Sequence, residues 1–125
     1  ALQLDDADFA IIAFGTASRA SQTAVKMLRE SGLRGGLFRP ITLWPFPEKQ
    51  LSELAERVKG ILVVEMNSGQ MLHDVREAVA GKTPVRFYGR MGGFIPRPSD
   101  IVSEVSKMAE DLVGSSREGS NVHLN

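Results

Sequence analysis

The sequence predicts an α/β fold in three layers, with a mostly parallel β-sheet between two layers of helices. Short runs such as FAIIAF (residues 9–14) and ILVV (residues 61–64) are apolar at every position, which is typical of parallel strands covered on both faces. Each run is followed by apolar residues at helical spacing. Four such strand-then-helix cycles occur, and right-handed crossovers would place their helices on both faces of one sheet.

The first cycle begins with a strand over residues 9–14, which ends at Gly15. The helix that follows stops at Gly32, and Thr16 or Ser18 can serve as its N-cap. Its apolar stripe consists of Ala17, Ala20, Ala24 and Leu28.

The second cycle begins with GLFRPITLW (residues 36–44). This strand is expected to be short, because Pro40 has no amide proton and must lie at the strand's end or at a bulge. Pro45 and Pro47 then break the chain, and Pro47 suits the first position of a helix. That helix stops at Gly60, and its apolar stripe consists of Leu51, Leu54, Ala55 and Val58.

The third cycle is a strand over residues 61–65, followed by a helix that ends at Gly81. The apolar side of this helix consists of Met71, Leu72, Val75, Ala78 and Val79. Pro84 precedes VRFY (residues 85–88), which predicts the fourth strand. A glycine-rich loop over residues 89–93 follows.

The last helix starts at Pro98 and is expected to end at Gly114, with Ile101, Val105, Met108 and Leu112 on its apolar side. The remaining GSSREGSNVHLN lacks apolar periodicity and is rich in glycine, serine and charge. We therefore expect one globular domain over residues 1–113 and a flexible tail over residues 114–125.

Composition narrows the functional classes. Fifteen basic and fifteen acidic residues cancel, so no overall field attracts nucleic acid or an anionic membrane. The chain has no cysteine, so it cannot form disulfides, thiolate zinc sites or iron–sulfur ligands. Its apolar runs are too short to span a bilayer, and no signal segment opens it. We expect a cytoplasmic protein without nucleic-acid or membrane partners.

The loops after the predicted strands carry the candidate site residues, because open parallel sheets bind ligands at the carboxyl ends of their strands. GTASR (residues 15–19) offers Thr16, Ser18 and Arg19 at a helix N-terminus, where a phosphate or carboxylate could bind. The same hydroxyls can simply cap the helix. Neither a Walker motif nor a GxGxxG fingerprint is present, so no motif supports nucleotide binding.

A second set follows the third strand: Glu65, Asn67 and Gln70 in VVEMNSGQM (residues 63–71). These side chains can grip a substrate, or Glu65 can transfer a proton if it is partly buried. Their loop contains no histidine, lysine or second acid, which argues against catalysis by this chain alone. The structural alternative is that Asn67 or Ser68 caps the next helix, with Gln70 satisfying backbone groups.

Three other loop residues are candidates for an interface or an anion contact. Arg39 ends an apolar strand, where burial would require an acidic partner such as Glu65 or a group on another subunit. Arg90 lies in the fourth loop and could contact an anion. Trp44 forms a rigid apolar cluster with Phe46 and the adjacent prolines, which either docks a partner or folds back over the second helix.

The chain resembles a known family along residues 7–112. FGTAS, LRESG, LFRPITLWPFPEKQL, GILVVEMNSGQMLHDVR and FYGRMGGFIPRPSDI are similar to the C-terminal domain of the alpha subunit of 2-oxoacid:ferredoxin oxidoreductases, in particular the 2-oxoglutarate-type branch. RPITLWPFP and VVEMNSGQM are the most specific of these segments. The resemblance implies a transketolase C-terminal-like fold with a five-stranded sheet and one antiparallel edge strand, for which ALQL at the start is a candidate.

The resemblance also implies an assembly that oxidatively decarboxylates a 2-oxoacid to an acyl-CoA. Such an assembly uses thiamine diphosphate, magnesium, coenzyme A and iron–sulfur clusters, and it passes electrons to ferredoxin. This chain lacks a GDG-type diphosphate motif and cysteines. We therefore expect no cofactor, metal or catalytic residue on this chain, although the complex is an enzyme. Its expected partners are the other alpha-subunit domains and the beta subunit, with gamma or delta subunits in some assemblies.

The alternative from another functional class is a stand-alone flavodoxin-like module. It would bind a small anion or nucleotide through GTASR and through GRMGG (residues 89–93). An ordered phosphate on the amides of residues 16–19, together with an internally packed Trp44, would favour this alternative.

Overall fold

The computed structural model describes residues 4–13, 17–39, 47–65, 70–89 and 97–122. Its strands and helices alternate as the sequence predicts. In chain order they are β1 (Phe9–Ala13), α1 (Ala17–Glu30), β2 (Gly35–Phe38), α2 (Glu48–Arg57), β3 (Gly60–Val64), α3 (Gln70–Val79), β4 (Val85–Tyr88) and α4 (Pro98–Val122).

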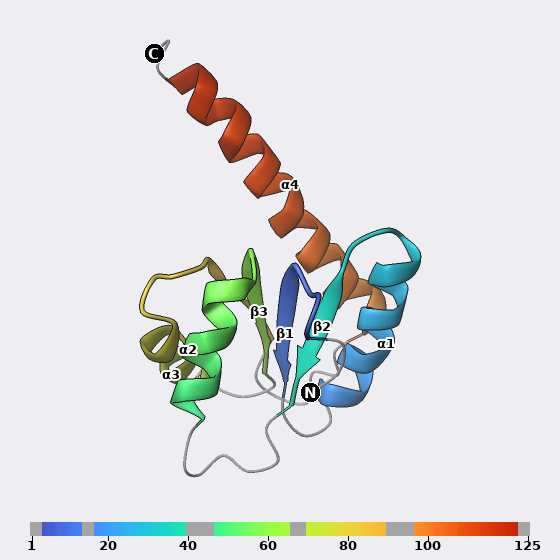
Figure 1. Cartoon of the computed structure of the whole chain (residues 1–125). Helices are drawn as coiled ribbons and strands as arrows, with labels where there is room; N and C mark the ends of the chain where they lie inside the picture. The colour runs from blue at the N-terminus through green and yellow to red at the C-terminus, as the bar shows by residue number, and fades with distance from the viewer. Residues whose placement is uncertain (1–3, 14–16, 40–46, 66–69, 90–96, 123–125) are drawn as a thin grey trace.

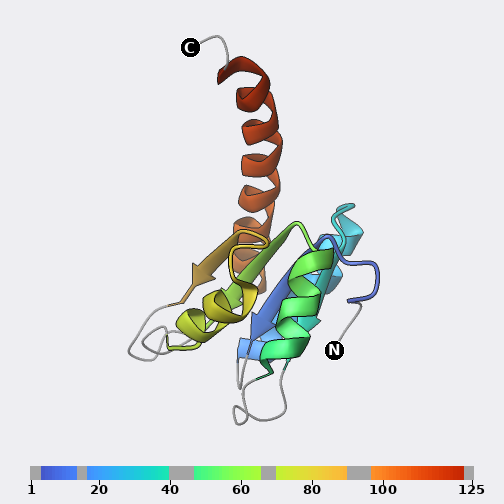
Figure 2. The same ribbon diagram turned by 60° about the vertical axis from the view of Figure 1, so that its left-hand side comes forward.

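The described strands form one parallel sheet in the order β2-β1-β3-β4, with the central strands visible in Figure 1 and the β4 edge in Figure 2. β1 and β3 are the central strands, and every residue of both is buried. The chain passes from β1 to β2 on one side and from β3 to β4 on the other, so the order of the strands reverses between β1 and β3. That point is where open α/β sheets form their ligand crevice.

The helices cover both faces of the sheet, as predicted. α1 and α4 pack on one face, and α2 and α3 pack on the other (Figures 1 and 2). Alternate residues of β1 serve the two cores: Phe9 and Ile11 face α1 and α4, whereas Ala10 and Ile12 face α2 and α3. The continuous apolar runs are therefore explained by burial on both faces.

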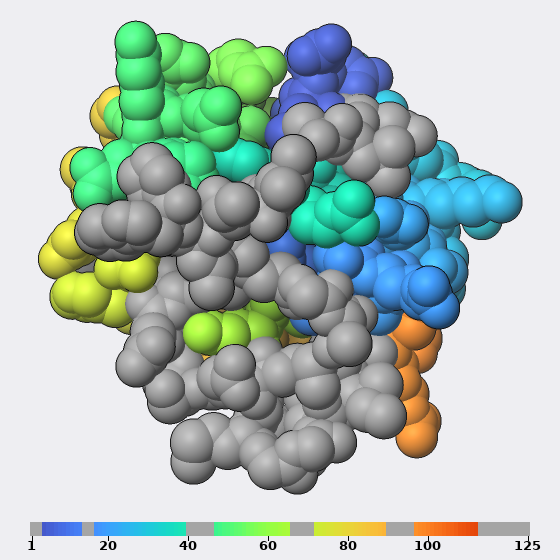
Figure 3. Space-filling model, turned by 90° about the horizontal axis from the view of Figure 1, so that it is seen from below, coloured from blue at the N-terminus to red at the C-terminus, as the bar shows by residue number. Residues whose placement is uncertain are grey.

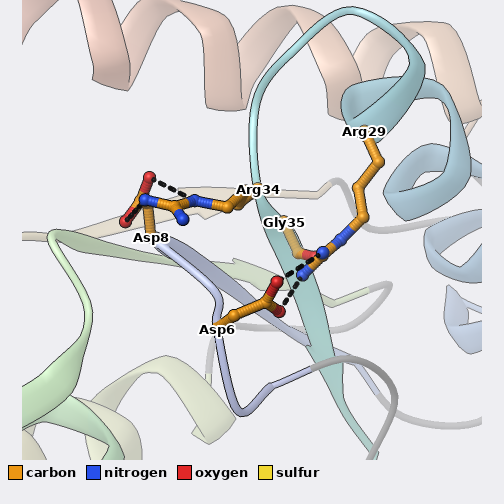
Figure 4. Close-up of polar contacts among 5 residues, drawn as sticks. All are labelled: Asp6, Asp8, Arg29, Arg34 and Gly35. Atoms are coloured by element: carbon orange, nitrogen blue, oxygen red, sulfur yellow. Dashed lines mark hydrogen bonds and ion pairs between the residues drawn. The ribbon is translucent and has the colours of Figure 1, made fainter.

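A cluster of ion pairs ties the segment before β1 to β2 and α1 (Figure 4). The guanidinium of Arg29, in the last turn of α1, donates to Asp6 at 2.8 Å and 3.1 Å and to the carbonyl oxygen of Gly35 at 2.9 Å. Arg34 pairs with Asp8, with 3.3 Å between Nε and Oδ2. These contacts lie at the amino ends of the strands, away from the predicted site.

α4 does not end at Gly114 as the sequence analysis expected. It continues to Val122 and projects beyond the sheet, past the amino ends of the strands (Figures 1 and 2). Glycine inside a helix costs only about 1 kcal/mol relative to alanine, and no proline follows Gly114 to stop the helix. Flexibility of residues 114–125 and the division after residue 113 stay predictions.

The predicted fifth strand falls largely outside the described residues. Residues 1–3 of ALQL are not described, and Leu4 lies outside the sheet. The antiparallel edge strand therefore stays a prediction. Within the described residues, none of the helices is long and apolar enough to cross a membrane.

Candidate functional site

The candidate site lies at the carboxyl ends of the strands, around the reversal between β1 and β3. Figure 3 views the molecule from this end, with α1 on one side of the strands and α2 and α3 on the other. The described site residues follow the end of a strand or lie at the start of the next helix, so the topology brings them to one edge of the sheet. They are Ser18, Arg19, Arg39, Glu65 and Gln70. We call this edge the carboxyl rim.

The N-terminus of α1 is built from small buried residues. Ala17 is fully buried and Ser18 is 4% exposed. Ser21 is also buried, and its hydroxyl donates to the carbonyl oxygen of Ala17 at 2.8 Å. Ser18 lies one residue inside the helix, so it is not the N-cap that the sequence analysis considered. Arg19, next to it, is exposed at the rim.

Glu65 directly follows β3 and is only 7% exposed. Its backbone amide donates to the carbonyl oxygen of Tyr88 at 3.1 Å, which extends the β3–β4 ladder by one residue. A Cβ atom built on Gly89 would overlap the carbonyl oxygen of Glu65. The backbones that leave β3 and β4 are therefore in close contact at Glu65 and Gly89. This contact fixes the position of the Glu65 backbone, from which the buried side chain extends.

The start of α4 is held at the same edge by a side-chain hydrogen bond. The Tyr88 hydroxyl, at the end of β4, donates to Oδ2 of Asp100 at 2.9 Å. Asp100 is in the first turn of α4, where the helix dipole also favours a carboxylate. The sequence analysis did not identify this pair. Tyr88 at the strand's end and an acid in the next helix's first turn are the signal that could have found it.

Arg39 is exposed, so no desolvation cost demands an acidic partner within this chain. Its pairing with Glu65 or with a group on another subunit stays a prediction. β2 ends at Phe38, one residue earlier, and its buried pattern stops there. A long cationic side chain just past the end of an edge strand reaches solvent without a desolvation cost.

The remaining predicted site residues are less completely described. Gln70 is the first residue of α3, which places its backbone at the rim. Thr16, Trp44, Asn67 and Arg90 lie outside the described residues, so their roles as caps, anion contacts or docking groups stay predictions. The same applies to the choice between a docked and an internally packed Trp44.

The described rim is polar. It presents one buried carboxyl group on Glu65, an exposed cation at each of Arg19 and Arg39, and the Tyr88–Asp100 pair. Among the described residues, no group of three or more histidine, cysteine, aspartate and glutamate side chains is placed to hold a metal ion. The location of the cofactors on other domains stays a prediction.

Comparison with known proteins identifies relatives among oxidoreductase subunits. Residues 7–101 match the family described as pyruvate:ferredoxin oxidoreductase core domain II. The chain is 43% identical over 104 residues to 2-oxoglutarate synthase subunit KorA of Methanothermobacter marburgensis, a match that covers 83% of this chain and 28% of that subunit. It is 40% identical over 108 residues to ketoisovalerate oxidoreductase subunit VorB of Methanothermobacter thermautotrophicus, covering 86% and 30%.

Two solved structures share the fold. The 2-oxoglutarate:ferredoxin oxidoreductase from Magnetococcus marinus, with 2-oxoglutarate, coenzyme A and succinyl-CoA bound, superposes with a TM-score of 0.72 at 29% identity, over 82% of this chain and 18% of that one. A split-gene transketolase, an inactive beta4 tetramer, superposes with a TM-score of 0.71 at 22% identity, over 86% and 40%. The second likeness shows the fold alone, and it confirms the transketolase-like architecture.

The chain thus spans less than a third of the length of the two curated relatives described above. Its match to the family nevertheless includes β1 to β4, all the strands of the described sheet, and reaches the first turn of α4. The chain belongs to the pyruvate:ferredoxin oxidoreductase core domain II family.

Proposed function

We propose that residues 1–125 form a non-catalytic interface domain of the alpha-type subunit of a 2-oxoacid:ferredoxin oxidoreductase. The whole enzyme would oxidatively decarboxylate a 2-oxoacid to an acyl-CoA and reduce ferredoxin. In this proposal, the carboxyl rim contacts the neighbouring domains or subunits that carry the reaction centre. The enzyme is proposed to be cytoplasmic.

The observation that carries the proposal is that this chain matches only part of the length of each related subunit. The chain matches subunits of 2-oxoglutarate and ketoisovalerate oxidoreductases, but it corresponds to only 28% and 30% of their length. The matched part is the size of one domain, so about 70% of each related subunit lies outside it. This division of the subunit supports an interface role.

The geometry of the rim is consistent with this role. Exposed Arg19 and Arg39 extend from the ends of α1 and β2. Two exposed cations suit contacts with acidic groups on a protein surface, where charge complementarity sets register and partner choice. Buried Glu65 directly follows the central strand β3 and would orient groups that the partner brings.

The cofactors follow from the proposed enzyme. Coenzyme A is bound in the related 2-oxoglutarate:ferredoxin oxidoreductase structure. Thiamine diphosphate, magnesium and iron–sulfur clusters are proposed for the full complex on domains outside residues 1–125. The beta subunit, with gamma or delta subunits where they exist, and ferredoxin are the proposed partners.

Calorimetric titration tests whether residues 1–125 have a reaction centre of their own. The expected result is no heat of binding when thiamine diphosphate and Mg²⁺ are added to the 125-residue chain, and no turnover of 2-oxoglutarate or 2-oxoisovalerate. Either a micromolar thiamine diphosphate complex or measurable 2-oxoacid consumption by the chain would contradict the proposal.

Charge reversal at the rim tests the interface role. Arg19→Glu and Arg39→Glu, introduced together into the full subunit, are expected to reduce co-purification of its partner subunits at least fivefold. Arg57→Glu is the matched control, because Arg57 is an exposed arginine in the last turn of α2, at the opposite end of the strands. Unchanged assembly of the double variant would argue against the carboxyl rim as the contact surface.

A further inference from the structure

A second surface lies at the other end of the sheet. A groove of about 280 Å³ opens between the amino ends of β3 and β4 and the middle of α4. It is lined by Lys59, Pro84, Val85, Arg86, Met108, Asp111 and Leu112. Because parallel strands share one direction, this groove and the carboxyl rim are at opposite ends of the same strands.

The floor of the groove is apolar and its rim is charged. Met108 is 5% exposed and packs against Gly60, while Leu112 is half-buried beside it. On one side, Arg86 pairs with Asp111 at 3.0 Å and with Glu104 at 3.4 Å. On the other side, Lys59 is exposed, and none of the described residues offers its ammonium group an ion pair. The groove thus joins a hydrophobic contact to a cation available to an acidic group.

The groove continues into the free edge of β4. The amide of Ile61 donates to the carbonyl oxygen of Pro84 at 2.9 Å, and the amide of Glu65 donates to that of Tyr88 at 3.1 Å. The backbone groups of alternate residues in a strand point to the same side. Those of Val85 and Phe87 therefore point away from β3.

The described sheet ends at β4, so no described strand pairs with this edge. All four residues of β4 are half-buried, whereas all four residues of β2, the other outer strand, are buried. An exposed edge with unpaired amides and half-buried apolar side chains is the structural basis of strand addition by a partner peptide. β4 therefore differs from β2 in a way that points to an occupant.

We propose that an extended segment from the rest of the oxidoreductase subunit pairs with the edge of β4 and places an apolar side chain in the groove, with an acidic residue at Lys59. This inference rests on the proposed function and adds a second contact, distinct from the carboxyl rim. The edge amides of Val85 and Phe87 supply main-chain hydrogen bonds. The groove and Lys59 supply specificity.

The length of the relatives supports a segment of the same subunit as the occupant. About 70% of the related KorA and VorB subunits lies outside the part that this chain matches. That much polypeptide is long enough to contact a domain of this size at more than one surface. A segment that packs on the apolar groove and its adjoining strand edge gains both hydrophobic burial and hydrogen bonds.

Residue-resolved amide hydrogen exchange tests the proposal. The 125-residue chain alone is compared with the assembled oxidoreductase that contains it. Exchange at Val85 and Phe87 is expected to slow at least tenfold on assembly, because their amides gain acceptors. The amides of Ile61 and Val63, already directed at β4, serve as the internal reference.

A charge-reversal variant tests the role of the groove. In the assembled enzyme, Lys59→Glu is expected to speed exchange at Val85 and Phe87 at least fivefold, since it repels the acidic residue of the docked segment. Lys26→Glu is the matched control, because Lys26 is an exposed lysine on α1. Unchanged exchange at Ile61 and Val63 would show that the variant is folded.

Equal exchange at Val85 and Phe87 in the chain and in the assembly would overturn the proposal. Protection that instead rises with the concentration of the chain alone would also overturn it, because the edge would then pair with a second copy. Failure of the carboxyl rim is a separate result. It would appear as intact assembly of the Arg19→Glu/Arg39→Glu variant, whatever happens at β4.

Discussion

Gly89 is the residue at which the β3–β4 junction depends on the absence of a side chain. The carbonyl oxygen of Glu65 occupies the position that a Cβ atom would take, and Phe87 Cζ lies 3.1 Å from that position. Since one of the obstacles is backbone, the clash cannot be relieved by rotating a side chain. Any larger residue must therefore push apart the two segments that carry the candidate site.

Gly89→Ala is expected to destabilise the chain by about 3 kcal/mol, the upper end of the cost of overpacking. Urea unfolding followed by circular dichroism measures it. Gly32→Ala is the matched control: Gly32 has a φ of +95° but nothing within 4 Å of its Cβ position, so only the backbone conformation opposes alanine. That change is expected to cost about 1 kcal/mol, and equal costs for the two would contradict the overlap.

Ala80 follows α3 with a φ of 53°, in the left-handed region that non-glycine residues rarely adopt. Ala80→Gly is expected to stabilise the chain by about 0.5–1 kcal/mol, because the relief of strain exceeds the added entropy of the unfolded chain. Thermal unfolding measures the change. Ala78→Gly, inside α3, is expected to destabilise by at least about 1 kcal/mol. A loss of stability with both variants would contradict the strain at Ala80.

At the scale of elements, the Arg29 cluster links α1, β2 and the segment before β1 (Figure 4). The hydrogen bond from the Arg29 guanidinium lowers the pKa of Asp6 below its ordinary value of 3.8, with help from the charges of Arg29 and Arg34. A carboxyl group whose pKa is lowered by folding stabilises the folded state above its unfolded pKa. That stabilisation is lost as the pH falls through the folded pKa.

Asp6→Asn is therefore expected to lower the unfolding free energy at neutral pH, and its deficit relative to the unmodified chain should narrow as the pH falls below 3.8. Denaturant unfolding between pH 2 and 7 measures this convergence. Asp5→Asn is the matched control, because it removes the same charge from an exposed neighbouring residue. A deficit from Asp6→Asn that stays constant with pH would show that the ion pair does not contribute through titration.

The existence and order of the elements could be predicted from sequence because burial on both faces leaves a local signature. Runs such as residues 9–14 and 61–64 need to be apolar at every position only when helices cover both sides. The end of α4 could not be predicted in the same way. A single glycine with no proline after it weakens a helix without stopping it, so the stop at Gly114 was wrong.

The candidate site was predictable to the level of loops and no further. Parallel topology brings the strand ends to one edge, which is why Ser18, Arg19 and Glu65 lie on the same rim. The exposure of Arg39 depends on where β2 ends, and the apolar run alone does not indicate that end. The approach of Gly89 to Glu65 depends on the register of β3 with β4, which no local pattern encodes.

At the scale of the whole molecule, two hydrophobic cores share one sheet. α1 and α4 bury one face, and α2 and α3 bury the other. The two cores meet through the strands of the sheet, and alternate residues of the central strands β1 and β3 belong to each core. Because neither core can lose its helices without exposing the strands that hold the other, we expect the chain to unfold in one cooperative transition.

Paired substitutions on opposite faces test this cooperativity. Leu28, in α1, is fully buried in one core, and Leu54, in α2, is 2% exposed in the other. Leu28→Ala and Leu54→Ala are each expected to cost about 3 kcal/mol. In native-state hydrogen exchange, each should lower the opening free energy of the β1 and β3 amides by that same amount, because opening either core opens the shared sheet. If Leu54→Ala reduced protection only in α2 and α3, the two layers would unfold separately, and the sheet would be held by α1 and α4 alone.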